Sequence, residues 1–123
     1  MLRALDEQRA GILEALCELI VPGSSRVGSV VYVDALLAGT PPPVRDRALA
    51  AIDALAPASA SAEELAAHER TAEFAFIRAL AIEAYYSDFV APGKDGPGAW
   101  AEIDFNPPTA QRLAKDWSYL GVA

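Results

Sequence analysis

"LDEQRAGILEALCELIVPG" (residues 5–23) is the stretch that decides the fold class. Its apolar residues recur at helical spacing, with acidic residues on the opposite face. They are Leu5, Ile12, Leu13, Leu16, Leu19 and Ile20. Pro22 and Gly23 end the pattern, because a proline cannot continue a helix and a glycine readily stops one. The stretch therefore predicts an amphipathic helix that buries one face against the rest of the chain.

The residues after this helix predict further helical segments with short breaks between them. "GSSRVGS" (residues 23–29) is typical of a linker. "VVYVDALLAG" (residues 30–39) favours a helix that Gly39 stops over a strand. The prolines at positions 41–43 predict a stiff spacer, and a helix is expected over residues 44–55.

The second half of the chain predicts a long helical segment, a loop and a short last helix. Ser61 is followed three residues later by a glutamate, which is the capping-box pattern that opens a helix. The helical pattern then runs to about Tyr86 and can break near Thr71. Residues 109–120 predict a last helix whose first threonine caps it.

These segments predict one all-α domain over residues 1–123. The length suits a single domain, and alanine, the strongest helix former, is the commonest residue. No alternating strand pattern occurs along the chain. The expected fold is a small bundle of four to five helices with a long aromatic, Gly/Pro-rich C-terminal loop.

The charge balance and the N-terminal residues exclude several classes of partner. Ten Lys and Arg stand against seventeen Asp and Glu, and the net charge of -7 disfavours both duplex nucleic acid and anionic membrane surfaces. Charged residues interrupt the N-terminal apolar pattern, so neither a signal peptide nor a membrane span is expected. We therefore expect a cytoplasmic chain with no nucleic-acid and no membrane partner.

Motifs for catalysis, cofactors and metals are absent from the sequence. It lacks the G-x-G-x-x-G motif of dinucleotide-binding folds, and Gly93-Lys94 is followed by Asp95 rather than by the Ser or Thr of a phosphate loop. Cys17 is interpreted as a buried small hydrophobe and His68 as a solvated residue, because zinc sites need several such ligands. We expect no catalytic, cofactor-binding or metal-binding residue in this chain.

Acidic residues gather around the C-terminal loop without a calcium-binding pattern. They are Asp88, Asp95, Glu102 and Asp104. Their spacing does not match that of an EF-hand loop, whose ligands recur at regular positions. Solvated or helix-capping roles are favoured for them.

The C-terminal loop itself, "YYSDFVAPGKDGPGAWAEIDFNPP" (residues 85–108), combines turn residues with bulky rings. Loops of this length are usually functional or disordered, and disordered segments are poor in aromatics. We therefore expect an ordered loop whose rings pack either onto the chain's own helices or onto a partner surface, where Tyr, Trp and Phe are enriched. The candidate interface residues are Tyr85, Tyr86, Phe89, Trp100, Phe105, Trp117 and Tyr119.

Two stretches resemble the small subunit, subunit 3 or gamma, of the gluconate 2-dehydrogenase type. The first is "LEALCELIVPGSSRVGSVVYVDALLAG" (residues 13–39), a helix, a proline break, a linker and a second helix. The second is "FIRALAIEAYYSDFVAPGKDGPGAWAEIDFNP" (residues 76–107), in which an aromatic pair, a Gly-rich loop and a Trp follow in order. Together they cover about half of the chain, and the second is the more specific.

The resemblance implies a non-catalytic subunit that stabilises, matures or escorts a large partner. In this family the partner is a glucose-methanol-choline-type (GMC-type) flavoprotein that carries the FAD and oxidises a sugar, a sugar acid or a glycoside. Two departures matter. The chain lacks the twin-arginine export signal of many relatives, which favours a cytoplasmic complex, and it has "APGKDGPGAW" (residues 91–100) where relatives tend to show P-x-Y-G-G-N.

Two other interpretations stay open at the level of the sequence. The chain can be a free-standing α-helical interaction module with an unrelated partner, which would be stable alone. It can also be a small enzyme or ligand-binding bundle, for which a ligand cavity near His68 would be the sign.

Overall fold

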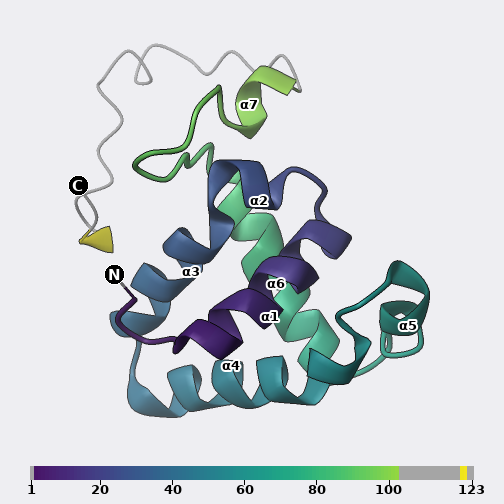
Figure 1. Ribbon diagram of the computed structural model, residues 1–123. Coiled ribbons are helices and arrows are strands. Elements are labelled where there is room, and N and C mark those ends of the chain that lie inside the picture. Colours follow the sequence, from purple (N-terminus) through teal and green to yellow (C-terminus); the bar gives the residue numbers. More distant parts are fainter. Residues whose placement is uncertain (1, 103–119, 122–123) are drawn as a thin grey trace.

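The computed structural model describes residues 2–102 and 120–121 (Figure 1). These residues form helices and no strand, so the predicted all-α class is confirmed for the described part of the chain. The elements are α1 (Glu7–Ile20), α2 (Ser24–Val27), α3 (Ser29–Ala38), α4 (Pro42–Leu55), the 3₁₀ helix η1 (Ala56–Ala58), α5 (Ala62–Ala66), α6 (Ala72–Tyr86) and α7 (Ala99–Glu102). The four helices α1, α3, α4 and α6 are 10 to 15 residues long and form the bundle.

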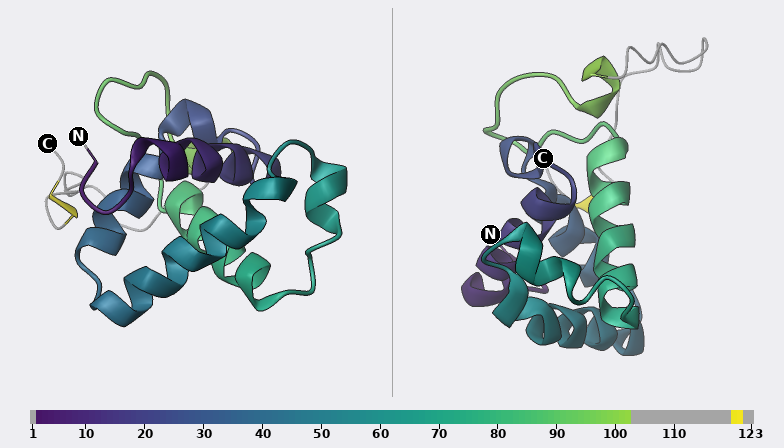
Figure 2. Two further views of the ribbon diagram at one scale, coloured as in Figure 1. Left: turned by 60° about the horizontal axis from the view of Figure 1, so that its bottom comes forward. Right: turned by 90° about the vertical axis from the view of Figure 1, so that its right-hand side faces the viewer.

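Helix α6 is the central element of the bundle. It contacts α1, α3 and α4, and it runs from α4 at one end of the molecule to α2 and α7 at the other (Figures 1 and 2). Side chains from all four long helices fill the core between them, and the largest aliphatic ones are Leu13, Leu16, Leu37, Ile52, Leu55 and Ile77. Each such side chain stabilises the fold by roughly 1.5–3 kcal/mol relative to an exposed position.

Polar side chains cap the N-termini of α5 and α6. The hydroxyl of Ser61 accepts a hydrogen bond from the backbone N–H of Glu64 at 3.2 Å, as its capping-box position predicts. Thr71 caps α6 in the same way, accepting from the N–H of Phe74 at 3.1 Å. The break near Thr71 is therefore confirmed, and the segment from Ser61 to Tyr86 forms two helices with a turn between them.

Three short segments differ from their prediction, and one of them is residues 99–102 of the predicted loop, which form α7. Residues 23–29 are no simple linker, because they contain α2. The Glu18 carboxylate makes this turn possible: it accepts hydrogen bonds from the N–H groups of Gly23 and Ser25 at 3.0 and 2.9 Å. The prolines at 41–43 are no spacer either. Two of them form the first turn of α4, where a fixed φ fits and no N–H is needed.

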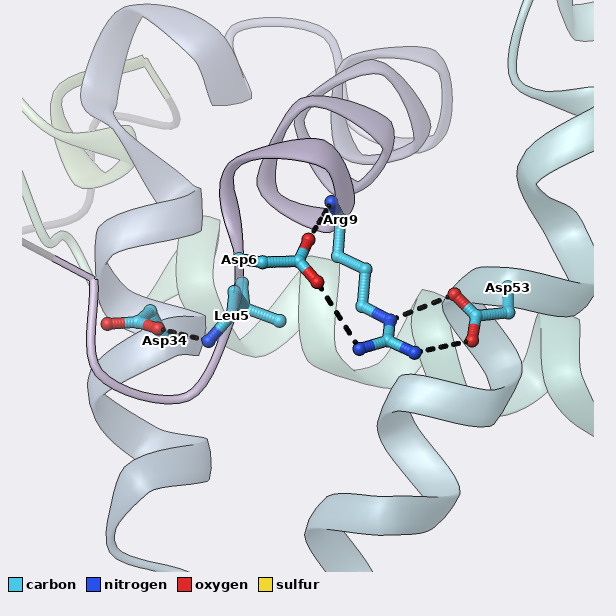
Figure 3. A network of polar contacts seen from close by, with 5 residues as sticks. All are labelled: Leu5, Asp6, Arg9, Asp34 and Asp53. Carbon is cyan, nitrogen blue, oxygen red and sulfur yellow. Dashed lines mark hydrogen bonds and ion pairs between the residues drawn. The ribbon is translucent and has the colours of Figure 1, made fainter.

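Figure 3 shows how α1 is joined to its neighbours. Its N-cap residue, Asp6, accepts a hydrogen bond from the N–H of Arg9 at 2.7 Å. The Arg9 guanidinium donates two hydrogen bonds to the Asp53 carboxylate on α4, at 2.9 and 2.8 Å, and these lower the pKa of Asp53. Both side chains of this pair are partly exposed, so the pair orients α1 on α4 more than it stabilises the fold.

No helix in residues 2–102 or 120–121 combines the length and the apolar character that crossing a membrane requires. The last helix expected from the sequence, residues 109–120, lies outside the described residues except for Leu120.

Candidate functional site

The candidate site lies where α6 ends and the aromatic loop begins. The chain leaves α6 and turns at Asp88, whose φ of +68° is uncommon for a residue other than glycine. The Asp88 carboxylate is buried, and its Oδ1 accepts a hydrogen bond from the backbone N–H of Trp100 at 3.1 Å. Since α7 begins at Ala99, Asp88 supplies an acceptor to the first turn of a helix far along the loop. The helix-capping role is thus the one that Asp88 takes.

Gly98 allows this close approach. A Cβ at Gly98 would lie 2.6 Å from the carbonyl oxygen of Asp88 and would overlap its carboxylate. The backbone just before α7 therefore rests directly on the turn after α6. A side chain of any size at position 98 would push the two apart.

Trp100 folds α7 back onto the end of α6. Its indole Nε1 donates a hydrogen bond to the Tyr86 carbonyl oxygen at 2.9 Å, which satisfies one of the carbonyls left over at the end of the helix. The Trp100 side chain is half-buried, and Tyr86 is 46% exposed. The Tyr86 ring stands edge to face with that of Tyr85, with 5.1 Å between the ring centres. Tyr86 and Trp100, which we call the aromatic surface, are thus two partly exposed aromatic residues joined at this end of the molecule by that hydrogen bond.

Two other predicted interface residues point inward. Tyr85 and Phe89 are each 1% exposed and belong to the hydrophobic core. Phe89 packs edge to face on Tyr32 at 5.4 Å, and the Tyr32 hydroxyl donates to Glu83 at 2.9 Å. For these two rings the chain's own helices provide the packing surface, which was one of the two interpretations of the loop.

The middle of the loop is held by α2. The Arg26 guanidinium donates to the carbonyl oxygens of Asp95 and Pro97, at 3.2 and 2.8 Å. The N–H of Ala91 donates to the Val27 carbonyl at 2.8 Å. These hydrogen bonds hold the middle of the loop against α2. Sequence reasoning missed Arg26, because nothing local to the segment 23–29 indicates that its partners lie about 70 residues away.

The seven predicted interface residues thus fall into three groups. Tyr86 and Trp100 reach the surface, Tyr85 and Phe89 lie in the core, and Phe105, Trp117 and Tyr119 lie outside the described residues. Any contact of these residues with a partner stays a prediction.

Within residues 2–102 and 120–121, Cys17 and His68 do not belong to a group of side chains that could hold a metal ion. Cys17 is fully buried, and burial, followed by the charges of Glu14 and Glu18, raises its pKa to about 12. No cluster of three or more His, Cys, Asp or Glu residues in the described ranges could hold a metal ion. His68 lies in the turn after α5, where its carbonyl oxygen accepts from the Thr71 hydroxyl at 2.8 Å.

Two open grooves are lined in part by residues of α6. In one, of about 190 Å³, the Arg47 guanidinium lies over the Phe76 ring, 5.3 Å from its centre. The other, of about 420 Å³, begins at Glu69, next to His68, and is lined by Phe74 and by the side chains of Arg70 and Arg78. Neither contains a buried polar side chain that would orient a small ligand.

Comparison with known proteins adds no relative: no protein family matches the chain, and neither a curated protein nor a solved structure shows significant similarity to it.

Proposed function

We propose that this chain is a non-catalytic small subunit of the gluconate 2-dehydrogenase subunit 3 type. In this proposal it binds and stabilises a large GMC-type flavoprotein that oxidises a sugar, a sugar acid or a glycoside. The flavin and the catalytic residues would belong to the large subunit, and the complex would act in the cytoplasm. The resemblance of residues 13–39 and 76–107 to that family supports this assignment.

The observation that carries the proposal is the surface formed by Tyr86 and Trp100. Tyr86 and Val44 are the large apolar residues that the described part of the chain exposes, and Val44 lies in the first turn of α4. Tyr86 instead adjoins the half-buried indole of Trp100, which is held in place by its hydrogen bond. Rigid, partly exposed Tyr and Trp side chains are the usual anchors of protein interfaces.

Co-expression tests the proposal directly. The chain is produced together with a GMC-type flavoprotein encoded beside it, and the mixture is separated by size exclusion. We expect the two chains to elute together and the flavin absorbance to follow the large one. The small chain alone, mixed with FAD and desalted, should show no flavin band. Separate elution would contradict the proposal and favour an interaction module with an unrelated partner.

Substitution of Tyr86 tests the surface. Tyr86→Ala removes an exposed ring and keeps the carbonyl oxygen that binds Trp100, so the fold should be unaffected. If the ring is an interface anchor, its loss should weaken binding by about 2 kcal/mol, or roughly 30-fold in Kd. Val44→Ala is the matched control, because it removes an exposed apolar side chain from α4, which lies at the opposite end of the molecule from α7 (Figure 1).

Trp100 requires a second measurement, because it contributes to both the fold and the surface. Trp100→Ala should weaken assembly, and Trp100→Phe keeps an aromatic ring while removing the N–H that binds Tyr86. Thermal unfolding by circular dichroism separates loss of folding from loss of binding. Lys94→Ala, at an exposed position of the loop, should change neither.

A further inference from the structure

One buried carboxylate holds the segment that precedes α1. Asp34 of α3 is 3% exposed, and its carboxylate accepts hydrogen bonds from three successive backbone N–H groups. The distances are 2.9 and 3.2 Å to Arg3, 2.9 Å to Ala4 and 2.9 Å to Leu5. Figure 3 shows Asp34 and Leu5 facing each other. Such charge-assisted bonds are stronger than those between neutral groups, so this segment has a fixed path along α3.

The side chain of Arg3 then reaches the other end of the chain. Its guanidinium donates a hydrogen bond to the carbonyl oxygen of Leu120. Leu120 is 4% exposed and belongs to the same hydrophobic cluster as Leu5. Gly121 has a φ of +73°, and a Cβ there would lie 2.7 Å from the Arg3 Nη1 atom. Residues 120–121 therefore lie directly against the N-terminal segment (Figure 1).

We infer that Asp34, Arg3 and residues 120–121 form a clasp that works in a fixed order. Asp34 binds the backbone of Arg3, and the side chain of Arg3 then binds Leu120. The first step uses only backbone N–H groups, so it does not need the Arg3 side chain. The second step needs the first, because a long guanidinium side chain holds one geometry only when its own backbone is anchored. Asp34 is therefore a positioning residue that acts on Leu120 through Arg3.

The clasp connects the N-terminal segment to residues 120–121, a contact that the sequence motifs do not indicate. Leu120 directly follows Tyr119 and comes three positions after Trp117, two of the predicted interface residues. The clasp thus holds Leu120 at a defined position on the folded domain. The inference uses contacts within this chain alone, so it holds whether or not the proposed partner is correct.

Nuclear magnetic resonance on the full, isotope-labelled chain tests the order of the clasp. Solvent exchange of the Ala4 and Leu5 amides reports the Asp34 step, and the methyl chemical shifts of Leu120 report the Arg3 step. In Arg3→Ala we expect the Leu120 methyls to move toward random-coil shifts while both amides keep their protection. In Asp34→Ala we expect both signals of the clasp to be lost. Asp46→Ala, which removes an exposed carboxylate of α4, is the matched control and should change neither readout.

Gly121→Ala perturbs the clasp at its C-terminal part rather than at Asp34. It provides a second test if the Asp34 variant fails to fold. The added methyl group meets the Arg3 guanidinium at a position of positive φ, so the contact between Arg3 and Leu120 should be lost and the Leu120 methyls should move toward random-coil shifts, while the Ala4 and Leu5 amides stay protected. The inference is overturned if Leu120 keeps its buried shifts in a folded Asp34→Ala chain or in Arg3→Ala. It is equally overturned if Arg3→Ala or Gly121→Ala exposes the two amides.

Discussion

The Asp88 carboxylate accepts a hydrogen bond from the backbone N–H of Trp100, 3.1 Å away, and so joins the end of α6 to the start of α7. A second hydrogen bond joins the same two helices, because the indole N–H of Trp100 donates to the Tyr86 carbonyl oxygen. A loop of Gly and Pro residues is thereby closed at its base, and Tyr86 and Trp100 are placed side by side. The geometry of the candidate interface depends on this closure.

Asp88→Ala should destabilise the fold more than Asp88→Asn. The alanine loses the cap, which costs about 0.5–2 kcal/mol, and must adopt a left-handed backbone, which costs about 1–2 kcal/mol more. Asparagine tolerates this conformation and keeps an acceptor oxygen, so it should lose only a fraction of that stability. Urea unfolding followed by circular dichroism measures both free energies. Equal losses in the two variants would contradict the role of the cap and of the positive φ.

Gly98→Ala and Gly11→Ala should have opposite effects on the free energy of unfolding. At Gly98 the new methyl group meets the Asp88 backbone and carboxylate, so the loop must open and stability falls. At Gly11 no atom lies within 4 Å of the added Cβ, and the position is inside α1. There alanine should raise stability by about 0.5–1 kcal/mol, because it restricts the unfolded chain and favours the helix. The same urea titrations test both variants. A loss of stability in Gly11→Ala would contradict the open space around Gly11.

Glu18 should make the fold sensitive to acid. Hydrogen bonds from the backbone N–H groups of Gly23 and then Ser25 lower the pKa of Glu18 below its ordinary value of 4.5. The folded state therefore favours the ionised carboxylate. The contribution of Glu18 to the free energy of unfolding is fully present above about pH 4.5. It is lost as the pH falls through the lower, folded-state pKa.

Thermal midpoints recorded between neutral pH and about pH 3 check this prediction. Glu18→Gln should be less stable than the natural chain near neutral pH, and the difference should shrink on acidification. Glu14→Gln, an exposed acid of the same helix, controls for the change in net charge. A stability difference between Glu18→Gln and the natural chain that stays constant over this range would contradict the role given to the two backbone N–H groups.

Cys17 should be inert in the folded chain. Burial raises its pKa to about 12, so at about pH 8 almost no thiolate is present, and the sulfur is also inaccessible to reagents. A disulfide reagent should react with it only after unfolding in urea. The raised pKa also means that the neutral thiol contributes to the free energy of unfolding. This contribution is fully present below the ordinary pKa of 9.0 and is lost as the pH rises toward the folded-state pKa. Cys17→Ala should remove that alkaline loss, and rapid labelling of the native protein would contradict the burial.

The sequence alone predicted the four long helices α1, α3, α4 and α6. The spacing of Leu13 and Leu16, the cap at Ser61 and the stop at Gly39 are local signals, because a helix forms its hydrogen bonds within one short segment. The break at Thr71 was readable for the same reason. The prolines at 41–43 misled, since a proline run suits both a spacer and the first turn of a helix.

Tertiary structure alone decided which aromatic rings are available to a partner. Tyr85 and Tyr86 are neighbours of the same residue type at the end of one helix, yet one lies in the core and the other is exposed. Successive helical residues point about 100° apart, so the direction in which α6 packs separates them. Sequence motifs show that aromatic rings gather here, but not which way each of them points.

The same limit applies to the polar contacts that order the chain. Arg26 binds carbonyl groups about 70 positions away, and Asp34 binds N–H groups about 30 positions away. Every residue has similar backbone groups, so the sequence of either segment does not indicate which backbone groups its side chain will bind. Local periodicity and capping determined the helices of this protein. Its loop closure, its terminal clasp and its exposed aromatic surface arise only when packing brings distant segments together.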